Sequence, residues 1–432
     1  MDRRQFIRAS GLAAAGIAAS GSVASAATPV TRRWIEEKWA LDQIIQANGM
    51  DWDQGRSRGL AATCGPEAEG DITTLRARIK KFADFSHAYE AAARRREALA
   101  REHEAAGEVV SARDNYFIAA QFWAGAQWPI YEKNDQNMAY NARKRECYAK
   151  YAQLADHHVE VVSIPLGKNV IPAYFHLPPG YRGGRVPAIV SIPGMDGSKE
   201  GRVALYGDRW LERGFAVLAI DGPGEYESPL LGSYVRREAW LAAGPVLANW
   251  LGARQEVDPQ KLGVVGTSFG SLFGTWLSAA EPRFKAVAVQ STCLEPGCRT
   301  IFEQASPTFK MRFMFMSGYT DEAEFNKFAK TLTWEGYAEK IRSPYLCIAG
   351  EADELCPIEN TERMFKVMSA PRNLLVYQDA RHSIAGVPAA TNGPAYAPFM
   401  ADWMLARLNG KPTVSERWYI EASGRIDKTP YA

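Results

Sequence analysis

Short apolar runs alternate with helix-forming stretches through most of the second half of this chain, and this alternation strongly limits the folds open to it. The runs are rich in β-branched and aromatic residues, as buried strands are. We predict strands at 186–192, 215–220, 262–265, 285–289, 345–349 and 373–377. We predict helices between them at 199–213, 234–254, 272–280, 358–368 and 396–408. Such alternation is typical of a parallel sheet with helices on both faces, so the expected fold class is α/β.

The first part of the chain has a helical pattern instead. From Thr31 to Leu154 strong helix formers predominate, and scattered glycines divide them into several helices. Two more strands are predicted after His157 and His158, at 159–164 and 170–177. The expected divisions are a helical domain at 27–156, an α/β domain at 157–410 with an insertion at 291–335, and a tail at 411–432.

The N-terminus resembles a twin-arginine export signal. Arg3 and Arg4 precede Phe6, a run of small apolar residues follows, and residues 24–26, Ala-Ser-Ala, resemble a cleavage site. We therefore expect residues 1–26 to be a signal peptide, the export machinery to be a partner, and the mature protein to be periplasmic.

Charge and composition exclude several other classes. The 51 Lys and Arg residues nearly balance the 49 Asp and Glu residues, so nothing indicates a nucleic-acid partner. No apolar run reaches the roughly 18 residues of a membrane span. Six cysteines are too few for a disulfide scaffold. A disulfide between Cys293 and Cys298 is left open, and a homodimer is compatible with the sequence.

A nucleophile motif lies at the centre of the alternating region. Residues 266–270, Gly-Thr-Ser-Phe-Gly, fit G-x-S-x-G directly after a predicted strand and before a predicted helix. The glycines allow a strained turn that exposes the hydroxyl of Ser268. Ser268 is therefore the expected nucleophile.

The partners of Ser268 follow from chain order, which in this fold is Ser, then Asp or Glu, then His. His382 is the one histidine after Ser268, so it is the expected base. Asp353 follows the strand at 345–349 and is the preferred acid. The rival carboxylates are Glu351, Glu354 and Asp379.

The oxyanion of an acyl-transfer reaction needs preorganised donors. One should be the backbone N–H of Phe269, which follows the nucleophile. The other should come from the glycine-rich loop 193–197, with Met195 the preferred donor and Asp196 the second choice.

Together these segments resemble the α/β-hydrolase superfamily, and within it the branch of 2,6-dihydroxypseudooxynicotine hydrolase and related N-terminally capped serine hydrolases. The resemblance extends from roughly 35 to 410. It rests on Ser-Ala-Arg-Asp-Asn-Tyr-Phe-Ile-Ala-Ala at 111–120, Pro-Gly-Met-Asp-Gly-Ser-Lys-Glu at 193–200, Asp-Gly-Pro-Gly at 221–224, Gly-Thr-Ser-Phe-Gly at 266–270, Gly-Glu-Ala-Asp at 350–353, and His382. It implies an α/β-hydrolase fold preceded by a helical cap domain, with the same three catalytic residues. Residues 225–227, Glu-Tyr-Glu, depart from the small residue, Gly and Glu usual in the family.

The expected activity is hydrolysis of a small carbonyl substrate through an acyl-enzyme, without metal or cofactor. Ester or lactone hydrolysis comes first. Cleavage of a carbon–carbon bond beside a ketone, as in an aryl ketone or β-diketone, comes second, and exopeptidase activity third. Glu295 and Glu303 cannot be assigned a role. The alternative from another class is an inert binding protein on a hydrolase fold.

The segment 116–128 in the helical domain has two aromatic stripes at helical spacing. One carries Tyr116 and Trp123, and the other carries Phe117 and Trp128. We expect the stripe with Tyr116 and Trp123 to bind substrate, because polar-tipped aromatics suit a partly wet site.

Overall fold

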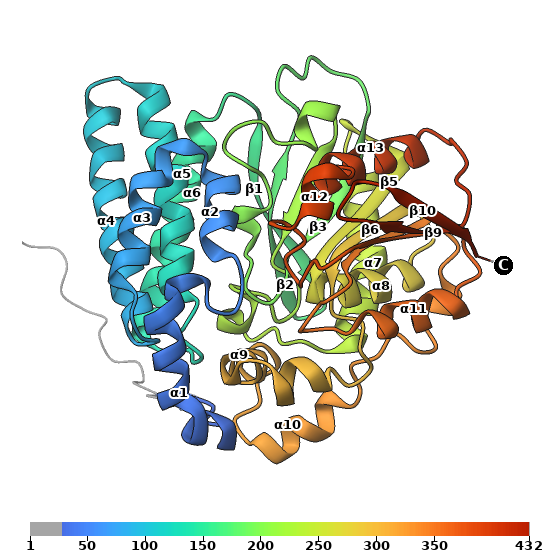
Figure 1. Ribbon diagram of the computed structural model, residues 1–432. Helices are drawn as coiled ribbons and strands as arrows, with labels where there is room; N and C mark the ends of the chain where they lie inside the picture. The colour runs from blue at the N-terminus through green and yellow to red at the C-terminus, as the bar shows by residue number, and fades with distance from the viewer. Residues whose placement is uncertain (1–27, 432) are drawn as a thin grey trace, which may run out of the picture.

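The computed structural model describes residues 28–431, so the signal predicted at 1–26 lies outside the described residues. A layer of helices stands beside a twisted sheet (Figure 1). The helices of this layer are α1 Arg32–Asn48, α2 Arg56–Cys64, α3 Glu69–Arg78, α4 Asp84–Ala105, α5 Val109–Gln127 and α6 Asp135–Leu154. They follow the helical pattern of the sequence.

Local chemistry sets the ends of these helices. The side chain of Thr31 caps α1 and that of Asn134 caps α6, each accepting a hydrogen bond from a backbone N–H three residues on. Gly65 follows α2 with a φ of 79°, which favours glycine. Helix α5 packs between α4 and α6 and is buried along nearly its whole length. Its apolar faces therefore form the core of the cap.

The sheet contains ten strands, with the order β1-β2-β4-β3-β5-β6-β7-β8-β9-β10. Their bounds are β1 Val159–Leu166, β2 Asn169–His176, β3 Val186–Ile192, β4 Ala216–Ile220, β5 Val257–Ser268, β6 Phe284–Thr292, β7 Tyr345–Gly350, β8 Arg372–Tyr377, β9 Glu416–Ile420 and β10 Ile426–Pro430. The strands from β4 to β9 pair in parallel, and β1, β2 and β10 pair antiparallel to their neighbours. The expected fold class is confirmed.

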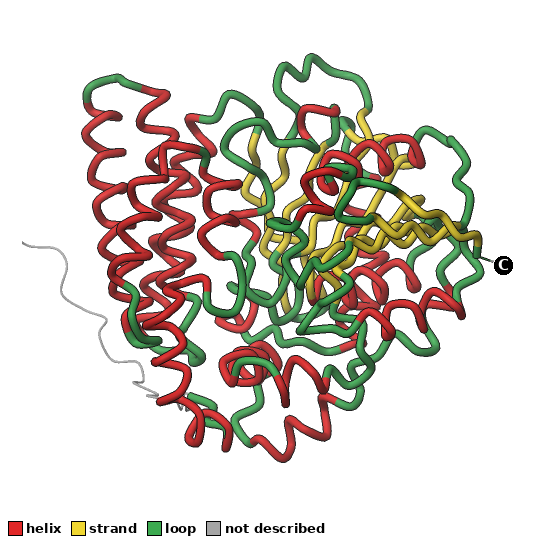
Figure 2. Tube along the Cα trace, viewed as in Figure 1, coloured by secondary structure: helices red, strands yellow, loops and turns green. Residues whose placement is uncertain are grey.

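Helices cover both faces of the sheet (Figure 2). Helices α7 Arg237–Gly252, α8 Phe269–Ala280 and α11 Ile358–Val367 share one hydrophobic cluster with the sheet. Helix α13 Tyr396–Leu408, with the short α12 Pro388–Asn392, belongs to the cluster on the other face. No helix among residues 28–431 is both long and apolar enough to cross a membrane.

The segment 291–335 separates β6 from β7, as expected for an insertion. It contains a π turn, η6 Thr300–Gln304, and the helices α9 Pro307–Ser317 and α10 Glu322–Ala329. Met311 and Phe315 of α9 belong to the same cluster as the cap residues, and α9 contacts α1. The insertion therefore packs against the cap as well as the sheet.

The helix predicted at 199–213 is wrong. This stretch holds only two 3-10 turns, η3 Lys199–Gly201 and η4 Leu211–Arg213. Between them Gly207 has a φ of 60°, and Asp208 accepts hydrogen bonds from three backbone N–H groups of the loop. The other short turns are η1 Gly49–Asp51, η2 Pro66–Ala68, η5 Ser228–Leu231 and η7 Ala338–Lys340.

The tail at 411–432 also needs correction, because it contains strands β9 and β10. Ile420 of β9 is fully buried and pairs with Tyr377 of β8. The backbone N–H of Gln378 donates to the carbonyl of Ile420. The chain end therefore belongs to the α/β domain.

We predict that Ile420→Ala lowers the free energy of unfolding by about 2–5 kcal/mol, because it leaves a cavity in a packed site. Val414→Ala, on the exposed segment before β9, should change it by less than about 0.5 kcal/mol. Denaturant unfolding of both variants measures the difference. Equal, small effects would mean that the hairpin contributes little to the fold.

Candidate active site

Ser268 sits on a strained turn between β5 and α8. Its φ of 55° is uncommon for a residue with a side chain. A Cβ on Gly266 would lie 2.2 Å from the carbonyl oxygen of Gly270, and one on Gly270 would lie 2.5 Å from that of Pro193. Only glycine fits at both places, so the motif is required by close backbone packing around Ser268.

The structure brings Ser268, His382 and Asp353 together in one chain of contacts. His382 Nε2 lies 3.1 Å from Ser268 Oγ, and His382 Nδ1 lies 2.9 Å from Asp353 Oδ2. Asp353 also accepts the backbone N–H groups of Leu355 and Cys356. These bonds fix the carboxylate, which in turn orients the imidazole.

The rival carboxylates have other contacts. Glu354 accepts the backbone N–H of His382, and Glu351 accepts the N–H of Asp379 and the hydroxyl of Tyr419. Within residues 28–431, none of these three carboxylates contacts the imidazole ring of His382. Asp353 is the carboxylate at the ring.

Electrostatics of the site favour the imidazolium form. Burial lowers the pKa of His382, but the charge and hydrogen bond of Asp353 outweigh burial, so the net pKa lies above the ordinary 6.5. A base with a raised pKa accepts a proton from a serine more readily.

Both expected oxyanion donors lie next to Ser268. Phe269 begins α8, so its backbone N–H has no partner within the helix. Met195 lies on the loop that packs against the turn, where a Cβ on Gly194 would come within 2.7 Å of the Ser268 Cβ. Met195 is buried and lines the cavity beside Ser268.

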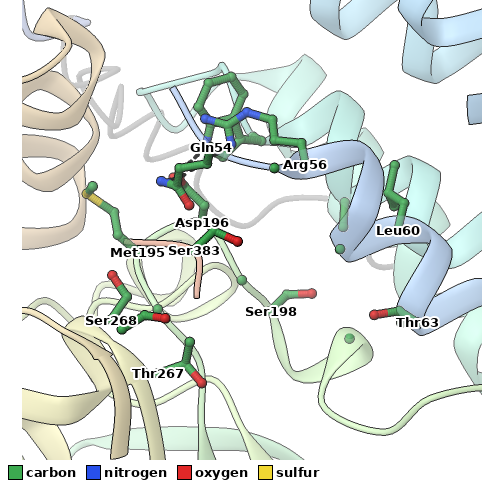
Figure 3. A pocket seen from close by; sticks show the side chains of 18 of the residues that line it. Gln54, Arg56, Leu60, Thr63, Met195, Asp196, Ser198, Thr267, Ser268 and Ser383 are labelled. Atoms are coloured by element: carbon green, nitrogen blue, oxygen red, sulfur yellow. Dashed lines mark hydrogen bonds and ion pairs between the residues drawn. The ribbon is translucent and has the colours of Figure 1, made fainter. Parts of the chain in front are cut away.

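A cavity of about 400 Å³ lies between the cap and the catalytic domain, a size suited to a small molecule. Figure 3 shows Gln54, Arg56, Leu60 and Thr63 of the cap across from Ser268. Apolar and aromatic cap residues line much of the wall. They include Leu60, Phe85, Tyr89, Ala124 and Trp128.

Cap side chains converge on Asp196, the neighbour of Met195. Trp128 Nε1 donates to one carboxylate oxygen at 2.6 Å, and Gln54 Nε2 donates to the other at 2.9 Å. Arg56 lies 3.5 Å from Asp196, stacks on Trp128 and pairs with Asp53. The cap thus contacts the loop 193–197 directly, and both carboxylate oxygens of Asp196 already accept hydrogen bonds.

Comparison with known families decides the classification. The model described as "Esterase FrsA-like" matches residues 84–327, more than half of the chain, including the cap helices α4, α5 and α6 and Ser268. This chain belongs to the FrsA-like family. The model of the prolyl oligopeptidase family matches residues 246–411, which include Ser268, Asp353 and His382. The resemblance to the α/β-hydrolase superfamily is therefore confirmed, and the FrsA-like protein is a hydrolase.

Several curated relatives are fungal hydrolases. The hydrolase LUC6 of a Fusarium species is 26% identical over 76% of this chain and 88% of its own length. The 20-hydroxy-prefusarin hydrolase FUS2 of Gibberella moniliformis gives the same identity and the same two coverages. The α/β hydrolase xenA of Xenoacremonium sinensis is 27% identical, and that match spans 55% of this chain and 58% of xenA.

Solved structures show the same fold. The 2,6-dihydroxy-pseudo-oxynicotine hydrolase has a TM-score of 0.70 at 22% identity, covering 83% of this chain and 97% of its own. The structure named AbyA5 has a TM-score of 0.57 at 14% identity, covering 82% of this chain and 99% of its own. The fold of this chain therefore recurs in other proteins of known structure.

The substrate-binding role expected for Tyr116 and Trp123 is wrong. Tyr116 donates to Glu104, and Trp123 Nε1 donates to Glu97, both inside the cap. Neither residue lines the cavity. Three residues of the other stripe do so instead: Gln121 and Ala124 of α5, and Trp128, which directly follows α5. The polar tips of the first stripe are satisfied by glutamates of α4.

The structure also shows the contacts of the residues whose roles the sequence left open. Glu295 accepts the backbone N–H of Thr300, and Glu303 pairs with Lys310, so neither faces the cavity. Cys293 and Cys298 are buried free thiols, and Cys293 Sγ lies 3.4 Å from Ser268 Oγ.

Sequence reasoning missed the cap residues that grip Asp196, and it missed Tyr226 and Arg312. The Tyr226 hydroxyl lies 3.3 Å from the carbonyl of Asp196, and Arg312 Nε donates to the carbonyl of Met195. The departure at 225–227 from the family's loop pattern was the available signal for Tyr226, which lines the cavity. Nothing in the sequence around Gln54 or Arg312 indicates a contact across the domains.

We predict that Trp128→Phe lowers kcat/KM for a 4-nitrophenyl ester about tenfold or more, because it removes a hydrogen bond to the charged side chain of Asp196 in the loop 193–197. Trp123→Phe is the matched control on the other stripe, and its kcat/KM should stay within about twofold. Steady-state kinetics of both variants test this. Equal losses would mean that the cap acts only through its own packing.

Proposed function

We propose that this protein is a serine hydrolase that cleaves a small ester or lactone through an acyl-enzyme. The observation that carries the proposal is the continuous chain of contacts from Ser268 through His382 to Asp353, of which Ser268 and His382 line the cavity. Nucleophile, base and orienting acid at these distances form the arrangement that acyl transfer requires.

In the proposed reaction, His382 Nε2 takes the proton of Ser268 as its Oγ attacks the carbonyl carbon. Asp353 holds the ring so that Nε2 faces the serine, and it stabilises the imidazolium. The N–H groups of Met195 and Phe269 receive the oxyanion. His382 then protonates the leaving oxygen. In the second half of the reaction water attacks the acyl-enzyme, His382 takes the proton of water, and the proton passes to Ser268 as the acid leaves.

The cavity lining favours ester or lactone cleavage over the two alternatives. Among the described residues, Asp196 is the one carboxylate that lines the cavity, and Trp128 and Gln54 occupy its oxygens. Carbon–carbon cleavage would gain from an additional acid, and an exopeptidase from a carboxylate for the free amine. An ester needs neither, because His382 can protonate an oxygen leaving group.

We predict that Ser268→Ala removes nearly all turnover and abolishes labelling by a fluorophosphonate probe. Ser383→Ala, which alters another serine of the same cavity, should keep the labelling. Gel fluorescence and ester kinetics provide the two measurements. More than about a tenth of wild-type kcat in Ser268→Ala would exclude the serine mechanism.

The pH profile should identify the acid. Neutral His382 is the active form, so kcat/KM should rise with pH through a pKa above 6.5. Asp353→Asn removes the group that raises this pKa, so the limb should move to lower pH, with kcat reduced by about 10⁴. Asp379→Asn should leave the profile in place. A limb that stays fixed in Asp353→Asn would contradict the assignment.

We further propose export through the twin-arginine route to the periplasm, supported by the sequence of residues 1–26. Replacing Arg3 and Arg4 by lysine should leave unprocessed, active protein in the cytoplasm. Cell fractionation with an immunoblot checks this. Normal amounts of the processed form in the periplasm would point to another route.

A further inference from the structure

Two arginines line the cavity, Arg56 and Arg202. The second, Arg202, contacts the residue that precedes the nucleophile. Arg202 follows η3, and its Nε donates to Ser191 Oγ at 2.9 Å. Its Nη2 lies 3.4 Å from the Oγ1 of Thr267, the residue before Ser268. Figure 3 shows Thr267 next to Ser268 at the cavity. Both partners of Arg202 are neutral hydroxyls, so they do not balance its charge.

The two carboxyl groups whose charges act on Arg202 have hydrogen-bond partners elsewhere. Glu225 accepts the backbone N–H of Gly222, and burial raises its pKa above the ordinary 4.5. Asp208 is engaged by backbone N–H groups of its own loop. Burial lowers the pKa of Arg202 to about 10, which still leaves it cationic at neutral pH. Within residues 28–431, Arg202 forms no ion pair.

Arg56 provides a contrast inside the same cavity. Its guanidinium lies 2.7 Å from Asp53 and 3.5 Å from Asp196, so two carboxylates flank it. Of the two arginines that line the cavity, Arg202 is therefore the one without a carboxylate partner. A poorly solvated cation of this kind is costly to the fold unless an anion pairs with it.

A further polar side chain, Gln290, contacts the same threonine as Arg202. Gln290 lines the cavity, and its Nε2 lies 3.5 Å from Thr267 Oγ1. Its Oε1 is buried without a hydrogen-bond partner. A half-turn of the amide would present the NH₂ group at that position instead. Arg202, Thr267 and Gln290 thus bring several hydrogen-bond donors to one part of the cavity wall.

We propose that Arg202, Thr267 and Gln290 form a carboxylate subsite, so that the favoured substrates are esters or lactones carrying a carboxylate close to the scissile carbonyl. The planar guanidinium can bind both oxygens of such a group, and its charge strengthens those bonds. This inference rests on the proposed function for the identity of the scissile bond, although the binding of the anion does not depend on it.

The kinetic test compares two esters that differ in one charge, the mono-4-nitrophenyl ester of glutaric acid and its methyl ester. Wild type should favour the anionic ester, and Arg202→Gln should lower the ratio of the two kcat/KM values by about 10- to 100-fold. Arg202→Lys should restore part of the preference. Arg182→Gln, which removes an exposed positive charge, should leave the ratio unchanged. An unchanged ratio in Arg202→Gln would overturn the subsite.

A binding test separates this inference from the proposed function. Glutarate should raise the melting temperature of wild type and Arg182→Gln, and it should raise that of Arg202→Gln much less. If wild type hydrolyses neither ester, the proposed function fails, and the melting temperatures still decide the subsite. Equal responses to glutarate in wild type and Arg202→Gln would reject it.

Discussion

One carboxylate ties the two domains together at the place where the reaction must occur. The oxygens of Asp196 accept hydrogen bonds from Trp128 and Gln54 of the cap, while its backbone belongs to the loop 193–197 beside Ser268. Tyr226 and Arg312 hold the same loop through the carbonyls of Asp196 and Met195. Segments distant in sequence thus meet at one short loop. Bonds to a charged, partly buried group are strong, so the loop and the cap take up one fixed arrangement.

A buried cluster of charged side chains begins just after this loop, at Lys199 and Glu200. Lys199 Nζ lies 3.0 Å from Glu200, 3.1 Å from Asp221 and 2.7 Å from Glu227. Burial lowers the pKa of Lys199, but these carboxylates outweigh burial and hold the pKa well above 10.5. Lys144 of α6 reaches Glu200 from the cap side. Glu227 of the loop after β4 therefore completes a network that spans both domains.

Much of the fold could be predicted because its signals are local. The periods of the strands and helices, the glycines around Ser268 and the position of His382 late in the chain all lie in short segments. The choice between the stripes of Trp123 and Trp128 could not be made in this way. Both stripes are apolar, and only the glutamates of α4 and the carboxylate of Asp196 distinguish them.

Two further errors have different physical causes. The stretch at 199–213 contains helix formers, but Lys199 and Glu200 serve the buried charge cluster, and the loop closes on Asp208. The hairpin of β9 and β10 had a usable signal in the residues Trp418, Tyr419 and Ile420, followed by a turn at Gly424.

The two outermost strands of the sheet also bear on how the protein behaves at high concentration. An open strand edge offers unpaired backbone groups to any other extended chain and can start aggregation. Here β1 contains Pro165 and β10 ends at Pro430, and neither proline can donate to a neighbouring strand. Exposed Asp427 and Lys428 add charge along β10. Both ends of the ten-stranded sheet therefore discourage the addition of an eleventh strand from another molecule.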